Sequence, residues 1–165
     1  MLFGRGSTGG IINQVSKQPR LITEHEVSAT VGTQGYQRYL GDFNFKLDDD
    51  AALRVNAMST DADGRGDNAS ASASTQRRGL ALDYRLGIGT ANEFQFSYYH
   101  LDYNDKPDWG TSWLDNRPAP APTNRYWYGL DSDFQKDQAD AVTLTHSHRW
   151  NDGSSLKTSL RDGYY

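Results

Sequence analysis

Residues 3–19 have the sequence FGRGSTGGIINQVSKQP, and this stretch is unlike the rest of the chain. Its first half is rich in glycine, and its second half carries the apolar pair Ile11 and Ile12 before it ends at Pro19. From residue 26 onward, apolar and polar residues alternate instead, in runs that are broken by turns. The stretch therefore marks a boundary between two kinds of sequence, and what it belongs to decides the fold that we expect.

Residues 4–9, GRGSTG, match the G-x-G-x-x-G pattern of dinucleotide-binding loops. That pattern works only between a strand and a helix, because the pyrophosphate has to meet the N-terminus of the helix. Here almost nothing precedes the pattern, and the β-branched stretch that follows it ends in a proline and does not predict a helix. We therefore reject a nucleotide site, and a glycine-rich turn that leads into a short strand is the simpler interpretation.

The composition limits the possible classes of protein. The 165 residues suffice for one domain with a sizeable core, and an aromatic content of 12% argues against a disordered chain. The formal net charge of −4 argues against a nucleic-acid-binding protein, which would carry a basic surface. The absence of cysteine excludes disulfides and thiolate metal sites. No run approaches the roughly 18 apolar residues of a membrane helix, so a membrane-spanning part would have to consist of strands.

Period-two alternation predicts seven strands, in which apolar residues share one face and polar residues the other. They lie at about residues 27–31, 39–47, 53–58, 80–86, 94–100, 142–150 and 156–161. The polar face carries the charged residues Asp42, Lys46, Arg54, Asp83, Arg85, Lys157 and Arg161. Leu40 is an exception, because it is apolar and falls on this face.

The connections between these strands differ in length. Those near Asp48, Gly87 and Asn151 are short, and those at 61–74 and 102–138 are long. Short and long connections thus alternate along the chain, and only the first connection, the tight turn at 32–35, breaks this pattern. Short and long connections at opposite ends are typical of outer-membrane barrels, with short periplasmic turns and long outer loops. Aromatic and histidine residues near the strand ends suit the girdles at the membrane surfaces, and the charged face suits a wet or plugged lumen.

Residues 4–19 resemble the end of the plug domain of the TonB-dependent outer-membrane receptors, and of the siderophore receptors in particular. In that family a GRG-x-x-GG-x-[IV]-N-x-[VI]-[ST]-K-x-P segment lies just before the first barrel strand. The matching residues are Gly4, Arg5, Gly6, Gly9, Gly10, Asn13, Lys17 and Pro19. The motif is long and its order is specific, although it covers only a small part of the chain.

The resemblance implies an all-β fold with two parts. Residues 1–20 would be the C-terminal end of a plug domain, and residues 21–165 the N-terminal part of an antiparallel, up-and-down transmembrane β-barrel with a long outer loop at about 102–138. We expect the polar groups of residues 5–17 to pack against lumen charges such as Asp42 and Arg85. Plugged barrels have about 22 strands, so seven strands indicate a fragment that begins inside the plug and ends inside the barrel.

The function that the resemblance implies is uptake of ferric siderophores across the cell outer membrane. The ligand would bind to the loops and the plug, and a TonB-type energy-coupling protein would displace the plug through a segment absent from this chain. We expect outer-membrane lipid as a further partner, no nucleic acid, and no enzyme activity. No resident cofactor or metal is expected, because the iron is carried as a siderophore complex. Catecholate and hydroxamate siderophores both stay open, and haem and cobalamin have less support.

The connection at 102–138 contains the candidate ligand-binding residues. A structureless connection of this length is usually functional or disordered. The candidates are Tyr103, Trp109, Trp113, Arg117, Arg125, Tyr126, Trp127 and Tyr128. Aromatic rings could stack on the flat groups of a siderophore, and arginines could donate to its anionic oxygens. Packing of these aromatics within the loop itself is an equally good interpretation, and acidic residues outnumber basic ones in the loop.

Two further patterns are weak. His146 and His148 share a strand face and could hold a metal, but Val142, Leu144 and Trp150 lie on that face too, which favours girdle residues. Residues 61–67 lack the spacing and the final glutamate of a calcium loop. The alternative to a receptor is a soluble β-sandwich, such as a lectin-like ligand-binding module, with the aromatic loop as its binding surface.

Overall fold

The computed structural model describes residues 16–64, 73–110, 112–120 and 127–165, and its regular structure there consists of strands. In chain order the strands are β1 (Glu24–Val31), β2 (Gln37–Lys46), β3 (Ala51–Asp63), β4 (Ser74–Leu86), β5 (Asn92–Asp105), β6 (Trp113–Leu114), β7 (Arg117–Pro118), β8 (Gln135–Arg149) and β9 (Ser155–Tyr164). No helix suited by length and hydropathy to crossing a membrane occurs within the described ranges.

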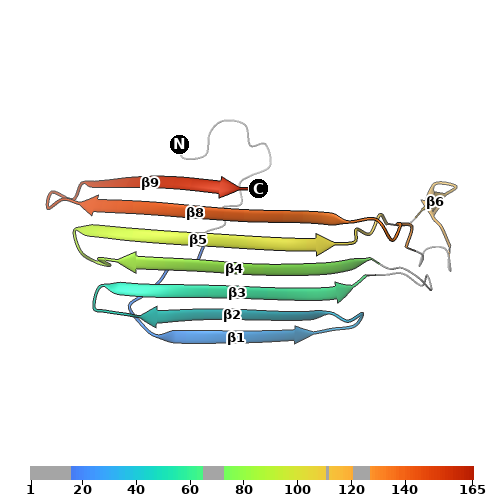
Figure 1. The fold of residues 1–165 in the computed structure, drawn as a ribbon, viewed down its shortest axis with the longest axis horizontal. Coiled ribbons are helices and arrows are strands. Elements are labelled where there is room, and N and C mark those ends of the chain that lie inside the picture. The colour runs from blue at the N-terminus through green and yellow to red at the C-terminus, as the bar shows by residue number, and fades with distance from the viewer. Residues whose placement is uncertain (1–15, 65–72, 111, 121–126) are drawn as a thin grey trace.

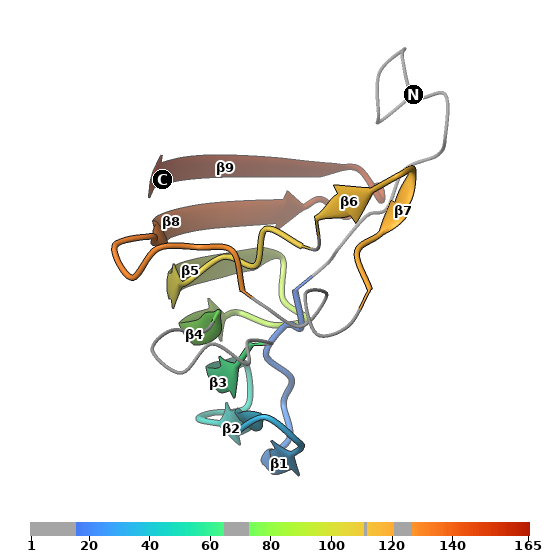
Figure 2. The ribbon, with the colours of Figure 1, turned by 90° about the vertical axis from the view of Figure 1, so that its right-hand side faces the viewer.

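One antiparallel sheet contains seven of these strands, in the order β1-β2-β3-β4-β5-β8-β9 (Figure 1). Strands that follow one another in the chain are therefore neighbours in the sheet, except that β8 follows β5, because β6 and β7 form a separate small hairpin. The edge strands β1 and β9 each have one neighbour. The sheet is twisted: in Figure 2, β1 and β2 are seen nearly end-on, whereas β8 and β9 run across the view. The predicted all-β, antiparallel, up-and-down architecture is confirmed, and all seven predicted strands are present.

The short and long connections lie at opposite ends of the sheet, as predicted. The turns after β2, β4 and β8 are at one end, and the strand ends that the two long connections join, those of β3 and β4 and of β5 and β8, are at the other (Figure 1). The β1–β2 turn is short but lies at the end of the long connections. Its central residues Gln34 and Gly35 have φ angles of 60° and 64°, which is the left-handed conformation of a tight hairpin turn.

The strands extend further into the long connections than the sequence predicted. The connection expected at 102–138 is shorter, spanning residues 106–134, because β5 continues to Asp105 and β8 begins at Gln135. At these ends of β5 and β8 both faces of the sheet carry polar residues. The sequence there shows no apolar–polar alternation that would indicate a strand. The ladder is held here by side-chain contacts as well, since Asp105 accepts hydrogen bonds from the backbone N–H of Gln76 over 3.1 Å and from Arg77 Nη2 over 2.8 Å.

The register gives the sheet one apolar face and one polar face. On the apolar face, one row across the strands consists of Phe45, Leu53, Tyr84, Phe96, Leu144 and Leu160. On the polar face, an adjacent row consists of Glu24, Asn44, Arg54, Asp83, Ser97, Thr143 and Arg161. The predicted distribution of apolar and charged residues between two faces is therefore correct.

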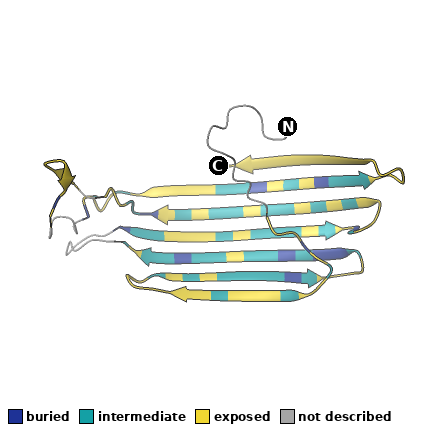
Figure 3. Cartoon of the chain, turned by 180° about the vertical axis from the view of Figure 1, so that it is seen from behind, coloured by how far each residue is buried: buried dark blue, intermediate teal, exposed yellow. Residues whose placement is uncertain are grey.

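The two faces differ in what covers them. Residues 16–23, here named the entry segment, lie across the polar face just before β1 (Figure 3). The polar face of the sheet is here named the wall, and two of its most buried side chains, Asn44 and Arg54, bind this segment. Large apolar side chains on the other face stay exposed, for example Phe96 at 44% and Leu144 at 48%. Among the described residues no second layer covers the apolar face, which suits contact with lipid.

We expect Phe96→Arg in the full-length protein to lower the free energy of unfolding from lipid bilayers by roughly 2–4 kcal/mol, because the charge would meet hydrocarbon. The matched control is Gln95→Arg. Gln95 lies on the polar face and donates to Asp83 Oδ2 over 2.6 Å, so an arginine there gains a carboxylate partner. Denaturant unfolding in vesicles measures the difference. Equal destabilisation by the two substitutions would contradict a lipid-facing apolar face.

Candidate functional site

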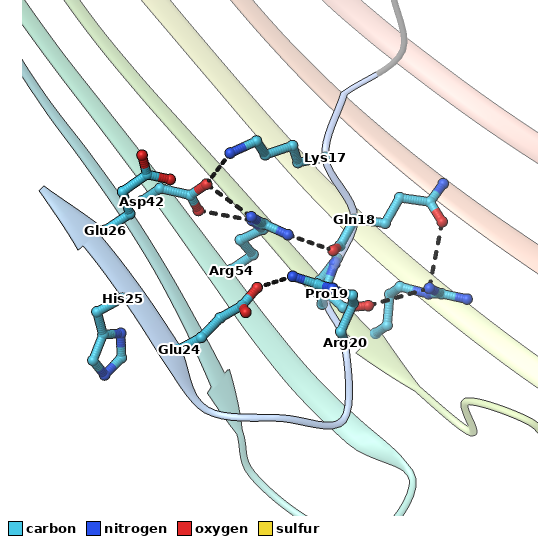
Figure 4. Close-up of a pocket in the computed structure, with 10 residues that line it drawn as sticks. Lys17, Gln18, Pro19, Arg20, Glu24, His25, Glu26, Asp42 and Arg54 are labelled. Carbon is cyan, nitrogen blue, oxygen red and sulfur yellow. Dashed lines mark hydrogen bonds and ion pairs between the residues drawn. The ribbon is translucent and has the colours of Figure 1, made fainter. Parts of the chain in front are cut away.

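The entry segment is bound to the polar face of β2, β3 and β4, and this contact is here named the junction. Figure 4 shows that side chains from these strands point at the segment rather than into open space. The junction borders a hollow of about 740 Å³ that is lined by residues of the segment, of β1 and of the wall. At the junction, Pro19 and Asn44 are fully buried.

Asn44 binds the backbone of the entry segment. Its Oδ1 accepts a hydrogen bond from the backbone N–H of Arg20 over 2.9 Å. Its Nδ2 donates to the carbonyl of Arg20 over 2.8 Å and also to the carbonyl of Ile22. Because the side chain is fully buried, these bonds have no competition from water, and one amide binds both backbone polar groups of Arg20.

Arg54 and Asp42 form an ion pair beside this amide. Arg54 Nε lies 2.8 Å from Asp42 Oδ1 and Nη2 lies 2.7 Å from Oδ2, which is a bidentate arrangement. The third arginine nitrogen, Nη1, donates to the carbonyl of Gln18 over 3.0 Å. Lys17 Nζ completes the cluster at 2.6 Å from Asp42 Oδ2. Both partners of the central pair are largely buried, with 6% and 14% of their side chains exposed.

Arg85 holds the other side of the segment. Its Nη1 lies 3.3 Å from the carbonyl oxygen of Pro19 and 3.4 Å from Gln18 Oε1. Its Nε donates to Glu93 Oε1 over 3.0 Å, which keeps the guanidinium neutralised within the wall. The expected packing of residues 5–17 against lumen charges is seen for Lys17, which pairs with Asp42, whereas Arg85 binds Gln18 and Pro19, just beyond that range.

The motif residues lie only partly within the described part of the chain. Lys17 and Pro19 lie at the junction, whereas Gly4, Arg5, Gly6, Gly9, Gly10 and Asn13 are outside the described residues. The sequence did not predict the role of Asn44. The only signal was its place between Phe43 and Phe45, where an uncharged amide stands among aromatic residues. The cluster as a whole binds a peptide segment, and its carboxylates are engaged by cations of the same chain.

The second candidate site is the connection 106–134. It contains the β6–β7 hairpin, which was not predicted from the sequence. Trp113 pairs with Pro118 and Leu114 with Arg117, so the turn consists of Asp115 and Asn116. Their φ angles of 48° and 59° are those of a two-residue hairpin turn that favours such residues. The Asp115-Asn116 dipeptide is the feature of the sequence that could have predicted this hairpin turn.

The aromatic candidates divide into packed and exposed residues. Trp127 is 2% exposed, and its indole N–H donates to the carbonyl of Pro107 over 2.8 Å. Its ring also excludes any side chain at Gly129, where a Cβ would lie 2.2 Å from Trp127 Cζ2. Trp109 and Trp113 are 68% and 70% exposed. Trp127 therefore packs within the loop, whereas the rings of Trp109 and Trp113 lie at the surface.

The remaining candidates lie around these rings. The Tyr128 hydroxyl is 3.3 Å from Ser112 Oγ, and Arg117 is exposed on the hairpin. Tyr103 lies within β5 instead of the loop, with the Arg77 guanidinium 5.5 Å from its ring centre. Arg125 and Tyr126 are outside the described residues.

At the opposite end of the sheet, His146 and His148 share the apolar face as predicted. Both have a ring nitrogen near Asn92 Oδ1, at 3.2 Å for His146 Nε2 and 2.8 Å for His148 Nδ1. His146 stacks on Phe94, and His148 meets Trp150 edge-on. Within the described ranges no group of three or more potential metal ligands occurs, and the aromatic surroundings favour the girdle interpretation.

We expect Asn44→Ala to destabilise the full-length protein by about 2–4 kcal/mol, because it leaves buried backbone groups of Arg20 and Ile22 without a partner. Asn56→Ala is the matched control, since Asn56 lies on the same face one row away but makes no hydrogen bond to the entry segment among the described contacts. Denaturant unfolding measures both variants. Equal stability of the two proteins would remove Asn44 as the holder of the segment.

In the outer connection, the backbone N–H of Leu130 and the indole N–H of Trp109 hold the pKa of Asp133 below its ordinary value. Because the pKa is lowered in the folded protein, these contacts are complete above the ordinary aspartate pKa and are lost as the pH falls through the lowered value. We expect Trp109 fluorescence, taken as the difference between wild type and Trp109→Phe, to titrate below the ordinary aspartate range. Asp133→Asn should abolish this transition, and its persistence in that variant would assign the transition to another group.

Known proteins are similar in sequence to this chain over nearly all of its length. No protein-family model matches the chain. The catecholate siderophore receptor Fiu of Escherichia coli K12 is 29% identical over 96% of this chain and 22% of its own length. The probable TonB-dependent siderophore receptor PiuA of Acinetobacter baumannii is 31% identical over 93% of this chain and 21% of its own.

The solved structures agree. The crystal structure of the ferric-catecholate import receptor Fiu from E. coli K12 in its open form matches 98% of this chain and 26% of that chain, with 28% identity and a TM-score of 0.84. The chain thus spans about a fifth of the length of the curated relatives that it matches. The expected partial β-barrel and outer-membrane location are confirmed. Over nearly its whole length, this chain is homologous to one part of the TonB-dependent siderophore receptors.

Proposed function

We propose that the full-length protein is an outer-membrane receptor that takes up ferric siderophores and is driven by a TonB-type energy-coupling protein. The observation that carries this proposal is the two-sided sheet. One face is apolar and uncovered, and the other is polar and binds the chain's own entry segment through Asn44, Arg54 and Arg85. A wall of this kind suits a barrel that holds a plug in its lumen.

The division of the chain into two parts belongs to the same proposal. Residues 1–20 are the end of the plug and residues 21–165 are the first part of the barrel. The contacts of Lys17, Gln18 and Pro19 with the wall support this division, because they attach the proposed plug end directly to the first strands. The coupling protein would act on a part of the receptor outside this sequence.

The proposed ligand is a ferric siderophore, as the names of Fiu and PiuA suggest. Trp109, Trp113 and Arg117 are exposed in the long connection and can offer rings and a guanidinium to such a complex. Trp127 would act indirectly, because its buried ring shapes the loop. The proposed receptor carries iron as a complex and needs no catalytic step on the ligand.

The soluble β-sandwich is the weaker alternative. A sandwich needs a second sheet against its apolar face. The other sheet in the described part of the chain is the β6–β7 hairpin, and the apolar row keeps Phe96, Leu144 and Leu160 exposed at 44%, 48% and 69%. This observation favours lipid as the partner of the apolar face.

We expect saturable quenching of tryptophan fluorescence when ferric siderophores are titrated into the purified full-length protein. Trp109→Ala and Trp113→Ala should each weaken binding roughly 2- to 10-fold, which corresponds to one lost aromatic contact. Trp150→Ala is the control, because Trp150 directly follows β8 and so lies at the end of the short turns, away from the long connection. Unchanged affinity in both loop variants would remove these rings from the binding site, and no saturable binding by the wild type would refute the receptor function.

A further inference from the structure

The apolar residues of the large sheet form a continuous band across its strands, here named the apolar band, and the outer edge of this band is oblique. The edge is marked on each strand by the last apolar or aromatic residue before the end of the sheet that carries the long connections. From β1 to β9 these residues are Val31, Tyr39, Ala57, Leu80, Tyr98, Val142 and Leu160. Tyr39 lies in the row that reaches Gln138 of β8. Leu160 pairs with Leu144 of β8, so the edge falls by six residues over the five steps from β2 to β9.

The inner edge of the apolar band, toward the short turns, is shifted in the same direction. Relative to the row that contains Leu144, the band on β2 extends six residues outward to Tyr39 and two residues inward to Leu47. On β8 it extends two residues outward to Val142 and six residues inward to Trp150. Figure 1 shows the short turns displaced in the same way, because the turn after β8 projects further than the turn after β2. The band therefore keeps its height while it moves along the strands.

The slope of the apolar band measures the tilt of the strands against it. Neighbouring strands lie about 4.8 Å apart, and each residue advances about 3.4 Å along its strand. The outer edge thus falls about 20 Å along the strands for about 24 Å across them, which is an angle of about 40°. Strands of outer-membrane barrels are tilted by about 35–45°, and their apolar band is about 25 Å tall. At a tilt of 40° the distance from Tyr39 to Leu47 spans about 21 Å of height, so both slope and height fit a bilayer.

Polar residues follow the outer edge of the band on the same face. They are the next residues of that face on six strands, here named the polar strip: Gln37, Ser59, Arg78, His100, Asp140 and Asp162. His100 Nδ1 lies 2.8 Å from Asp140 Oδ1, which also accepts a hydrogen bond from the Tyr98 hydroxyl over 2.8 Å. The Tyr39 hydroxyl donates to Gln37 Oε1 over 3.3 Å. Tyrosines that keep the ring in an apolar band and the hydroxyl at its edge are typical of the level where lipid tails meet head groups.

We propose that the polar strip is the surface by which the receptor contacts the lipid head groups of the outer leaflet, and that the strands cross the membrane at a tilt of about 40°. The apolar band lies in the hydrocarbon, and Tyr39 and Tyr98 anchor its outer edge. This inference goes beyond the proposed uptake of siderophores, because it concerns the lipid-facing side and holds for any ligand of the lumen.

The tilt also sets the height of the long connection 106–134. Because β5 continues from Tyr98 to Asp105, the connection begins about 18 Å above the edge of the apolar band. On β1 the edge lies at Val31, directly before the tight turn at 32–35, so this turn stays near the membrane surface. The ends of β5 and β8 thus stand above the membrane with water on both sides, which accounts for the polar residues on both of their faces.

Spin labels on single cysteines test the inference in a full-length protein that carries no other cysteine and is reconstituted in lipid vesicles. Val27 and Tyr164 lie in one row at opposite edges of the sheet. At the proposed tilt their depths differ by roughly 19 Å, which is more than half the thickness of the hydrocarbon core. A label at Val27→Cys should collide mainly with oxygen, which concentrates in hydrocarbon, and a label at Tyr164→Cys with a water-soluble nickel chelate. We expect the ratio of the two collision rates to differ about fivefold or more between these positions.

Tyr39→Cys and Leu160→Cys are the matched pair. They lie three rows apart but at the same proposed depth, so their ratios should agree within about twofold. A large difference within the row, together with equal ratios in the matched pair, supports the tilted band and its polar strip. Equal ratios at Val27 and Tyr164 would show that the membrane edge follows the rows, which overturns the inference.

Low collision rates with both reagents at all four positions would show that protein covers this face, which also overturns the contact with lipid. Siderophore binding is measured on the same labelled proteins. A failure of the depth prediction in proteins that bind the siderophore would therefore leave the proposed receptor function standing.

Discussion

The structure depends on one constraint: the two faces of the large sheet meet different environments. In every strand, successive residues therefore have to be apolar and polar in turn. The constraint holds across the sheet because the register brings residues of one kind opposite each other. The row from Phe45 to Leu160 and the row from Glu24 to Arg161 lie side by side and face opposite ways. A shift of one residue between two strands would place charges in the apolar row, so the pattern fixes the register.

The polar face is specialised for binding a backbone. Asn44, Arg54 and Arg85 all donate to main-chain carbonyls of the entry segment, at Arg20, Gln18 and Pro19. A proline suits the middle of this contact, because it has no N–H group that would need a partner in a buried position. The wall therefore recognises the path of the segment, and the pair of Lys17 and Asp42 adds a side-chain contact at its edge.

Much of the fold could be predicted from the sequence, because period-two alternation is a direct consequence of a two-sided sheet. The prediction failed where that cause is missing. Around Asp102 and Asp137 both faces are polar, so the ends of β5 and β8 looked like a loop. The site was harder to predict. The junction depends on contacts such as Arg85 with Pro19, which are 66 residues apart in the chain and leave no local pattern. Trp127 and Trp109 have the same side chain, yet only the fold makes one of them buried and the other exposed.

The contacts of the entry segment also order the assembly of the wall. The bonds from Asn44 and Arg54 span 24 and 36 residues, so they can form once the first three strands have paired. The contact of Arg85 with Pro19 spans 66 residues and has to wait for β4. Contacts between nearby parts of a chain close with less loss of entropy and so tend to form earlier. The segment would thus serve as a template that β2, β3 and β4 recognise one after another as they join the sheet.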